Sequence, residues 1–335
     1  MGALATTRSF TRLNWLLCMV VIAALSVFAQ AQSMLDQPHI PFRANLRANR
    51  ASDAFQSGSV FRTDVDLVLV SVTVLDRAER SVSGLRADSF QLLEDKSYQT
   101  IKYFSNQDEP VALAVVLDAS ASMAPRFEDA RKALLKLIDT SNPQDDFNII
   151  LVADQPRVAL DSTGSLDDFR REVESVQPNG ETALWDGMML GVRQLRKSSI
   201  PRKAMVVISD GGDNHSRVSE RELKSLLQEA DVEVYAVALV NPLASRKEER
   251  IGPLQLDEVT SVTGGRVLSA FGPIEISRAV EQIGRELRDQ YLLGYYPSHH
   301  SRDGKWHKLK VNLNRPQAPD RLRIYARKGY YKPAE

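Results

Sequence analysis

Three oxygen-bearing side chains stand on alternate residues in one short stretch of the chain. Asp118, Ser120 and Ser122 directly follow the apolar run Val111–Leu117, which is rich in β-branched residues. Such a run is typical of a strand that is buried on both faces. A short loop after the strand can bring one carboxylate and two hydroxyls to one point, and hard oxygen donors suit a small hard cation such as Mg²⁺. Taken alone, the same pattern also fits a turn followed by a helix N-cap.

Two later stretches favour the metal-site interpretation. A second buried apolar run ends in Asp210, which is followed by two glycines that permit a tight turn. In a doubly wound sheet the first and fourth strands are neighbours, and ligands bind at their carboxyl ends, so Asp118 and Asp210 are expected to face one another. The loop before a predicted helix at Leu184 adds the hydroxyl of Thr182. By itself, Thr182 would be interpreted as an N-cap.

The elements that must position these residues alternate between strands and helices, which predicts a mostly parallel, doubly wound six-stranded sheet with crossover helices. The expected strands are Val111–Leu117, Phe147–Ala153, Arg157–Leu160, Ala204–Ser209, Val232–Leu239 and Gly265–Leu268. The expected helices are one beginning at Phe127, then Leu166–Val176, Leu184–Leu195, Glu220–Ala230, Leu254–Val262 and Ile274–Leu287.

Strand patterns also flank this α/β stretch on both sides. The expected flanking strands are Val65–Leu75, Phe90–Glu94, Gln99–Phe104, Tyr291–Tyr296, His307–Leu313 and Leu322–Ala326. Either set alone has too few strands for a stable sandwich. We therefore expect the α/β domain to be inserted in a small β-sandwich-like domain that both chain ends build. The predicted divisions are a signal peptide at 1–31, a linker at 32–63, β-domain halves at 64–106 and 289–333, and the α/β domain at 109–288.

The first 31 residues resemble a secretory signal. Arg8 and Arg12 form a basic start, Trp15–Phe28 is apolar, and Ala29–Ala31 fits a small-x-small cleavage site. The alternative is an uncleaved membrane anchor. Cys18, the one cysteine, lies inside this segment, so the stability of an exported mature chain would depend on its core without a disulfide.

The numbers of Lys+Arg and of Asp+Glu residues are both 43, so the net charge gives no argument for binding of a nucleic acid.

The three motifs together carry a family resemblance. D-x-S-x-S at Asp118–Ser122, a later G-x-T at Gly180–Thr182 and a later S-D-G at Ser209–Gly211 resemble the metal-ion-dependent adhesion site of von Willebrand factor type A domains. The resemblance covers about Val111–Leu287, and the flanking strands resemble those of bacterial exported relatives of such domains.

The resemblance implies a ligand set and a function. Ser120, Ser122 and Thr182 would coordinate Mg²⁺ or Mn²⁺, and Asp118 and Asp210 would bind the cation directly or through water. Neutral inner ligands leave the cation much of its charge, so an open position would capture an acidic side chain of a partner protein.

Four further residues near the motifs need an interpretation. Ala121 stands where many members of the family have Gly, which would cost about 1–2 kcal/mol if that residue needed a left-handed backbone. Asp213 and Asp186 are expected either to cap helices or to contact the waters of the site. His215 is expected to be solvated.

Enzyme functions fit the sequence less well. There is no G-x-S-x-G elbow and no phosphate-binding G-x-x-x-x-G-K-[ST] motif. His299, His300 and His307 are expected to lie in or beside a plain exposed loop rather than at a second metal site.

We therefore expect a non-enzymatic recognition protein, exported to the periplasm, the cell surface or the medium. Its partner would be a protein, not a nucleic acid or nucleotide, and it would meet a membrane only through an uncleaved signal. The alternatives are a structural or assembly protein of the envelope with an unused metal site and, less favoured, a hydrolase.

Overall fold

A computed structural model describes residues 67–161, 166–241, 247–298, 304–314 and 322–332. All of the described residues belong to one compact unit. The predicted signal peptide and the predicted linker, together with His299 and His300, lie outside the described residues. Within the described ranges, no helix is both long enough and apolar enough to span a membrane.

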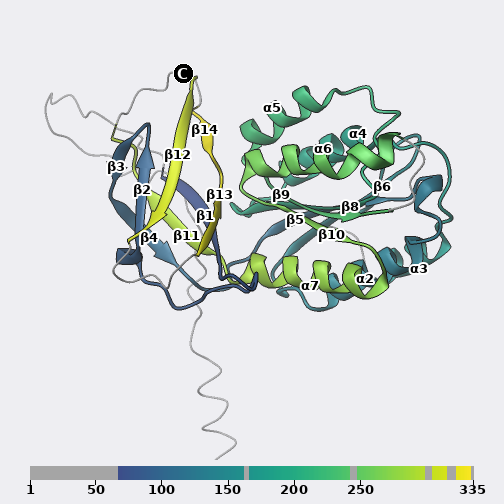
Figure 1. Ribbon diagram of the computed structural model, residues 1–335, viewed down its shortest axis with the longest axis horizontal. Helices are drawn as coiled ribbons and strands as arrows, with labels where there is room; N and C mark the ends of the chain where they lie inside the picture. Colours follow the sequence, from purple (N-terminus) through teal and green to yellow (C-terminus); the bar gives the residue numbers. More distant parts are fainter. Residues whose placement is uncertain (1–66, 162–165, 242–246, 299–303, 315–321, 333–335) are drawn as a thin grey trace, which may run out of the picture. The chain divides into compact units, whose positions relative to one another are not determined.

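The centre of the α/β half is a six-stranded sheet in the order β10-β9-β8-β5-β6-β7 (Figure 1). All pairings are parallel except that of β6 with β7, which form a hairpin. The strands are β5 (Ala112–Asp118), β6 (Asp146–Val152), β7 (Arg157–Leu160), β8 (Lys203–Ser209), β9 (Glu233–Leu239) and β10 (Val267–Ala270). This order confirms the predicted doubly wound sheet, with β5 and β8 as the neighbours whose carboxyl ends carry the acidic motifs.

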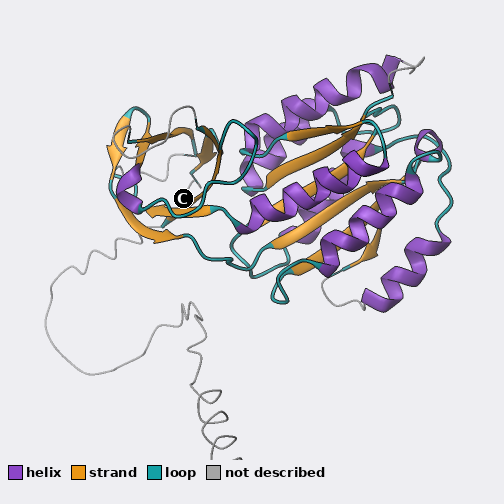
Figure 2. Ribbon diagram, turned by 60° about the horizontal axis from the view of Figure 1, so that its bottom comes forward, coloured by secondary structure: helices purple, strands orange, loops and turns teal. Residues whose placement is uncertain are grey.

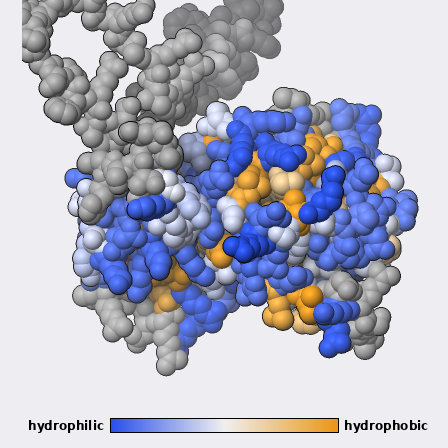
Figure 3. All heavy atoms as spheres, turned by 90° about the horizontal axis from the view of Figure 1, so that it is seen from above, coloured by the Kyte–Doolittle hydropathy of each residue, from blue (hydrophilic) through white to orange (hydrophobic). Residues whose placement is uncertain are grey.

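Helices cover both faces of this sheet, because its central strands are apolar on both sides (Figures 1 and 2). One face packs against α2 (Phe127–Asp139), α3 (Leu166–Ser175) and α7 (Pro273–Arg288). The other packs against α4 (Leu184–Leu195), α5 (Glu220–Ala230) and α6 (Lys247–Thr263). The face drawn in Figure 3 is mostly hydrophilic with small hydrophobic areas, as expected for helices that bury one side only.

Two four-stranded antiparallel sheets come from the chain on either side of the α/β half, in the orders β13-β1-β11-β4 and β14-β12-β2-β3. Both sheets mix strands from before and after that half, which confirms the predicted insertion. Their strands are β1 (Val68–Leu75), β2 (Phe90–Glu94), β3 (Ser97–Gln99), β4 (Ile101–Ser105), β11 (Tyr291–Tyr295), β12 (Trp306–Leu313), β13 (Arg323–Ala326) and β14 (Gly329–Tyr331). Their inward side chains form one buried apolar cluster.

Three details of the sequence prediction were wrong. The single strand expected at Gln99–Phe104 is divided, because the chain leaves one sheet after β3 and enters the other at β4, with the exposed Thr100 at the crossing. The strand β14 was not expected. The helix α6 begins before Pro253 rather than after it, so the expected start at Leu254 was too late.

Candidate metal centre

The carboxylate of Asp118 is buried at the carboxyl end of β5. Its side chain is inaccessible to solvent. The backbone N–H of Ser120 donates to Oδ1 at 2.9 Å, and the hydroxyl of Ser209 donates to Oδ2 at 2.6 Å. Ser209 Oγ in turn accepts the N–H of Gly211 at 2.8 Å. Ser209 therefore ties the ends of β5 and β8 together, a role that the sequence analysis did not assign to it.

A second carboxylate, that of Asp210, lies beside the first. Asp210 directly follows β8 and is only 2% exposed. Burial raises the pKa of Asp118 to about 6, and the negative charge of Asp210 adds to the increase. Asp210 Oδ1 is buried and has no hydrogen-bond partner among the described residues. The predicted meeting of the two acidic loops thus occurs in the structure.

The hydroxyls of Ser120 and Ser122 lie on the same loop with their Oγ atoms 3.1 Å apart. Ser120 is buried and Ser122 is partly exposed. Ala121 begins the short 3₁₀-helix η2 (Ala121–Met123) and has no left-handed backbone. The conformational cost considered for an alanine at this position is therefore not incurred.

Thr182 lies between the two acidic loops. The loop before it contacts the β5 loop, because Ala121 N–H donates to Gly180 O at 3.0 Å. The backbone of Thr182 contacts the β8 loop, since its N–H donates to Asn214 Oδ1 at 2.9 Å. Thr182 is buried and is not the N-cap of α4, which is Ala183.

Asp213 and Asp186 hold the β8 loop against α4. Asp213 Oδ1 accepts the N–H of Leu184 at 2.8 Å and so caps the start of the helix. Asp186 Oδ1 accepts the N–H groups of Arg217 and Val218 at 3.2 and 3.1 Å. Both carboxylates therefore fix the loop that follows Asp210, while a contact of either with waters of the site stays a prediction. The side chain of His215 is exposed, as expected.

A close contact of two backbones fixes the turn after Asp210. Gly211 has a φ of +83°, and a Cβ on it would lie 2.6 Å from the carbonyl carbon of Gly252 in α6. A Cβ on Gly252 would lie 2.3 Å from that of Gly211. Only glycine fits at either position, so α6 rests directly on the loop that carries the second carboxylate.

The residues present fit a divalent cation. Asp118 and Asp210 are both buried and the charge of one acts on the other, and two buried like charges are costly without a counter-charge. The hydroxyls of Ser120 and Ser122 supply neutral oxygens beside them. No group of three or more His, Cys, Asp or Glu side chains suited to a metal occurs in the described part of the chain, so hydroxyls would have to complete a ligand set here.

The sequence matches known proteins over this same region. Residues 113–212 match the model of the von Willebrand factor type A domain family. Inter-alpha-trypsin inhibitor heavy chain H3 of Mesocricetus auratus is 27% identical over 146 residues, which are 39% of this chain and 16% of that protein. Heavy chain H4 of Homo sapiens is 25% identical over 134 residues, which are 36% and 14% of the two chains. The chain thus spans less than a fifth of the length of these relatives.

A solved structure described as a von Willebrand factor type A protein from Catenulispora acidiphila covers 81% of this chain and 73% of its own, with 13% identity and a TM-score of 0.46. The matched residues 113–212 run from β5 through the loop of Asp210 and so contain all five candidate ligands. The matches over residues 113–212 support a von Willebrand factor type A domain within the α/β half of this chain.

Proposed function

We propose that this chain is a metal-dependent protein-recognition module. Asp118, Ser120, Ser122, Thr182 and Asp210 would hold Mg²⁺ or Mn²⁺, and an open position on the cation would take an acidic side chain of a partner protein. The observation that carries the proposal is the buried Oδ1 of Asp210, which has no hydrogen-bond partner among the described residues and lies beside the buried Asp118, because a cation would satisfy both. The first 31 residues support export of the chain.

Exposed apolar side chains near the candidate site support a protein partner. Phe271 directly follows β10 and is 59% exposed, and Ile274 in the first turn of α7 is 68% exposed. Leu254, two residues after the contact of Gly252 with Gly211, is also 68% exposed. These side chains follow the carboxyl edge of the sheet, as the candidate ligands do. Apolar residues beside a charged centre are typical of the core of a protein–protein interface.

The first test is metal binding. Calorimetry with Mg²⁺ and thermal melting in Mg²⁺ against EDTA should show binding and a higher melting temperature with the metal. At a hundredfold excess over the dissociation constant, the expected stabilisation is about 2.7 kcal/mol. Ser120→Ala should remove both effects without unfolding the protein, whereas Asp88→Ala, at an exposed site in the β half, should change neither. Equal melting in Mg²⁺ and EDTA, with no heat of binding, would contradict the proposal and favour a structural role.

The second test is metal-dependent capture of a partner protein. The immobilised chain should capture proteins from the envelope of the source cell in Mg²⁺ and release them in EDTA. The variant Ser120→Ala should capture none of them. Capture that is the same with EDTA would show that the interaction does not use the metal.

A further inference from the structure

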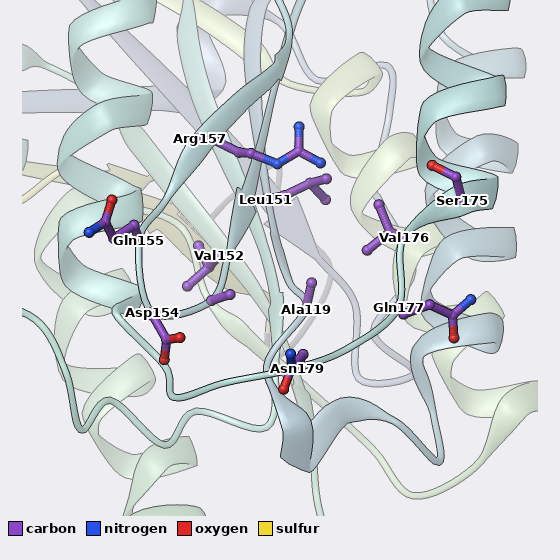
Figure 4. A pocket seen from close by; sticks show the side chains of 11 residues that line it. Ala119, Leu151, Val152, Asp154, Gln155, Arg157, Ser175, Val176, Gln177 and Asn179 are labelled. Atoms are coloured by element: carbon purple, nitrogen blue, oxygen red, sulfur yellow. The ribbon is translucent and has the colours of Figure 1, made fainter.

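A cavity of about 540 Å³ adjoins the candidate metal centre. Ala119, which separates Asp118 from Ser120, forms part of its wall. The other walls come from the β6–β7 hairpin and from the segment that follows α3 (Figure 4). The N–H of Asn179 in that segment donates to Ala119 O at 2.9 Å, so this wall of the cavity and the loop that follows β5 are fixed to each other. A partner residue that reached the metal would have this cavity as its neighbour.

Both apolar side chains and side chains with hydrogen-bond donors line this cavity. Leu151 and Val176 point toward each other in Figure 4, while Gln155 and Gln177 stand on opposite sides. Asn179 Oδ1 accepts the N–H of Gly180 at 2.8 Å, so the remaining hydrogen-bonding group of that side chain is its NH₂. The carboxamides and a guanidinium offer donors suited to an anionic or polar group.

The guanidinium in the lining belongs to Arg157 at the start of β7, and in Figure 4 it extends across the cavity toward Ser175. Arg157 forms an ion pair with Glu172 on α3. The two side chains are 53% and 34% exposed. Because exposed ion pairs contribute little to stability, a carboxylate of a partner can replace Glu172 at low cost.

A negative charge stands elsewhere in the same lining. Asp154 lies on the hairpin and accepts the N–H of Glu181 through Oδ1 at 2.6 Å. This carboxylate would repel an anion at its own end of the cavity, whereas Arg157 attracts one at the other. The lining therefore directs an anionic group to Arg157.

We propose that this cavity is a second recognition site, at which Arg157 binds a second carboxylate of the protein partner. The inference rests on the proposed function, in which a first carboxylate of the partner binds the metal. The inference restricts the partner to a protein segment that carries two acidic side chains close together. Arg157 then determines specificity, and Glu172 competes with the second carboxylate of the partner for Arg157.

Short peptides with blocked ends test this inference by NMR titration in Mg²⁺. One peptide, Gly-Asp-Gly-Gly-Gly, has a single carboxylate, and in three others Glu replaces each glycine after Asp in turn. The best of the three should bind about tenfold more tightly than the first, as expected for one charge-assisted pair. It should also shift the Nε–H signal of Arg157.

Three variants make the test specific. Arg157→Ala should abolish the advantage of the second carboxylate and leave the affinity of the first peptide unchanged. Glu172→Gln should increase the advantage, because it removes the competitor. Arg170→Ala, which breaks the ion pair of Arg170 with Asp139 outside the cavity lining, should change neither affinity.

Each outcome decides between the two proposals. Mg²⁺-dependent binding with equal affinities for all four peptides, or an advantage that survives Arg157→Ala, would overturn the second recognition site and leave the metal-dependent function intact. If no peptide bound in a Mg²⁺-dependent manner, the metal-dependent function would fail. In that case, binding of a Glu-containing peptide in EDTA that is lost with Arg157→Ala would still support the second recognition site. Any other result would overturn that site as well.

Discussion

Arg202 Nη2 donates a hydrogen bond of 2.8 Å to Gln290 Oε1, and this bond joins the start of β8 to the link between α7 and β11. The same nitrogen donates to Leu287 O at 2.7 Å. Gln290 Nε2 lies 3.1 Å from Thr73 Oγ1 on β1 and 2.8 Å from Glu233 Oε2 on β9. Both Arg202 and Gln290 are buried. Polar groups that are enclosed in this way connect the central sheet to the antiparallel sheets.

Arg202→Met should lower the free energy of unfolding by about 2–3 kcal/mol, because it removes charge-assisted hydrogen bonds and leaves their acceptors unpaired in a buried position. Denaturant unfolding followed by circular dichroism measures the change. Arg196→Met is the matched control. Arg196 pairs with Glu229 at 3.8 Å and is 49% exposed, so its loss should cost less than about 0.5 kcal/mol. Equal effects of the two substitutions would show that the buried network does not stabilise the fold.

Asp118→Asn should have opposite effects with and without metal. In EDTA at pH 7.5, above the pKa of about 6, the carboxylate of Asp118 is ionised, buried and close to that of Asp210. The substitution removes this unfavourable charge and should raise the free energy of unfolding by about 1–3 kcal/mol. In saturating Mg²⁺ the wild-type chain should have the higher free energy of unfolding, because only the wild-type chain is stabilised by binding the metal. A variant that is less stable than wild type in EDTA would show that Asp118 is mainly structural.

Gly252→Ser should weaken Mg²⁺ binding although Gly252 is no candidate ligand. The added side chain would meet the backbone of Gly211 and displace the loop of Asp210, and crowding of this kind costs about 1–3 kcal/mol. Gly272→Ser is the control, since the nearest atom to a Cβ there is Glu275 Oε2 at 3.9 Å. Calorimetry should show a larger dissociation constant for the first variant alone. Unchanged binding in Gly252→Ser would mean that α6 does not position the loop of Asp210.

Glu233→Gln should flatten the dependence of stability on pH. Burial raises the pKa of Glu233 above 4.5, although Gln290 and Arg202 favour its ionised form. A carboxyl group whose pKa is raised by folding binds its proton more tightly in the folded state. Its contribution to stability is therefore complete below pH 4.5 and is lost as the pH rises through the folded pKa.

Denaturant midpoints at several values from pH 4 to pH 8 measure this difference. The wild-type chain should lose stability relative to Glu233→Gln as the pH rises, and the two curves should run parallel above the raised pKa. A difference in stability between the two chains that does not change with pH would contradict a raised pKa of Glu233 in the folded state.

Much of the α/β half could be predicted from sequence because its signals are local. The seven residues of β5 are all buried, and an unbroken apolar run such as Ala112–Leu117 has few other places in a fold. Acidic and hydroxyl residues directly after two such strands lie at one edge of a parallel sheet by topology alone. The proximity of Asp118 to Asp210 follows from these two facts.

Other features depended on contacts between residues far apart in sequence. The exchange of sheets between β3 and β4 was not predicted, because β4 gains its partner only when β11 arrives after the whole α/β half. The hydrogen bond from Ser209 to Asp118 was also not predicted, and the expectation that Asp213 caps a helix did not specify α4. No local pattern distinguishes these side chains from ordinary turn residues.

The cavity beside the loop that follows β5 shows most clearly what could not be predicted from the sequence. Arg157 and Asn179 lie on different elements, and nothing in their spacing indicates a shared wall. The sequence by itself determined which residues are candidate ligands for a cation, since this depends on residue type and strand order. Tertiary packing decided what surrounds this candidate site, because the shape of a cavity depends on how a hairpin, a helix end and a loop meet in space.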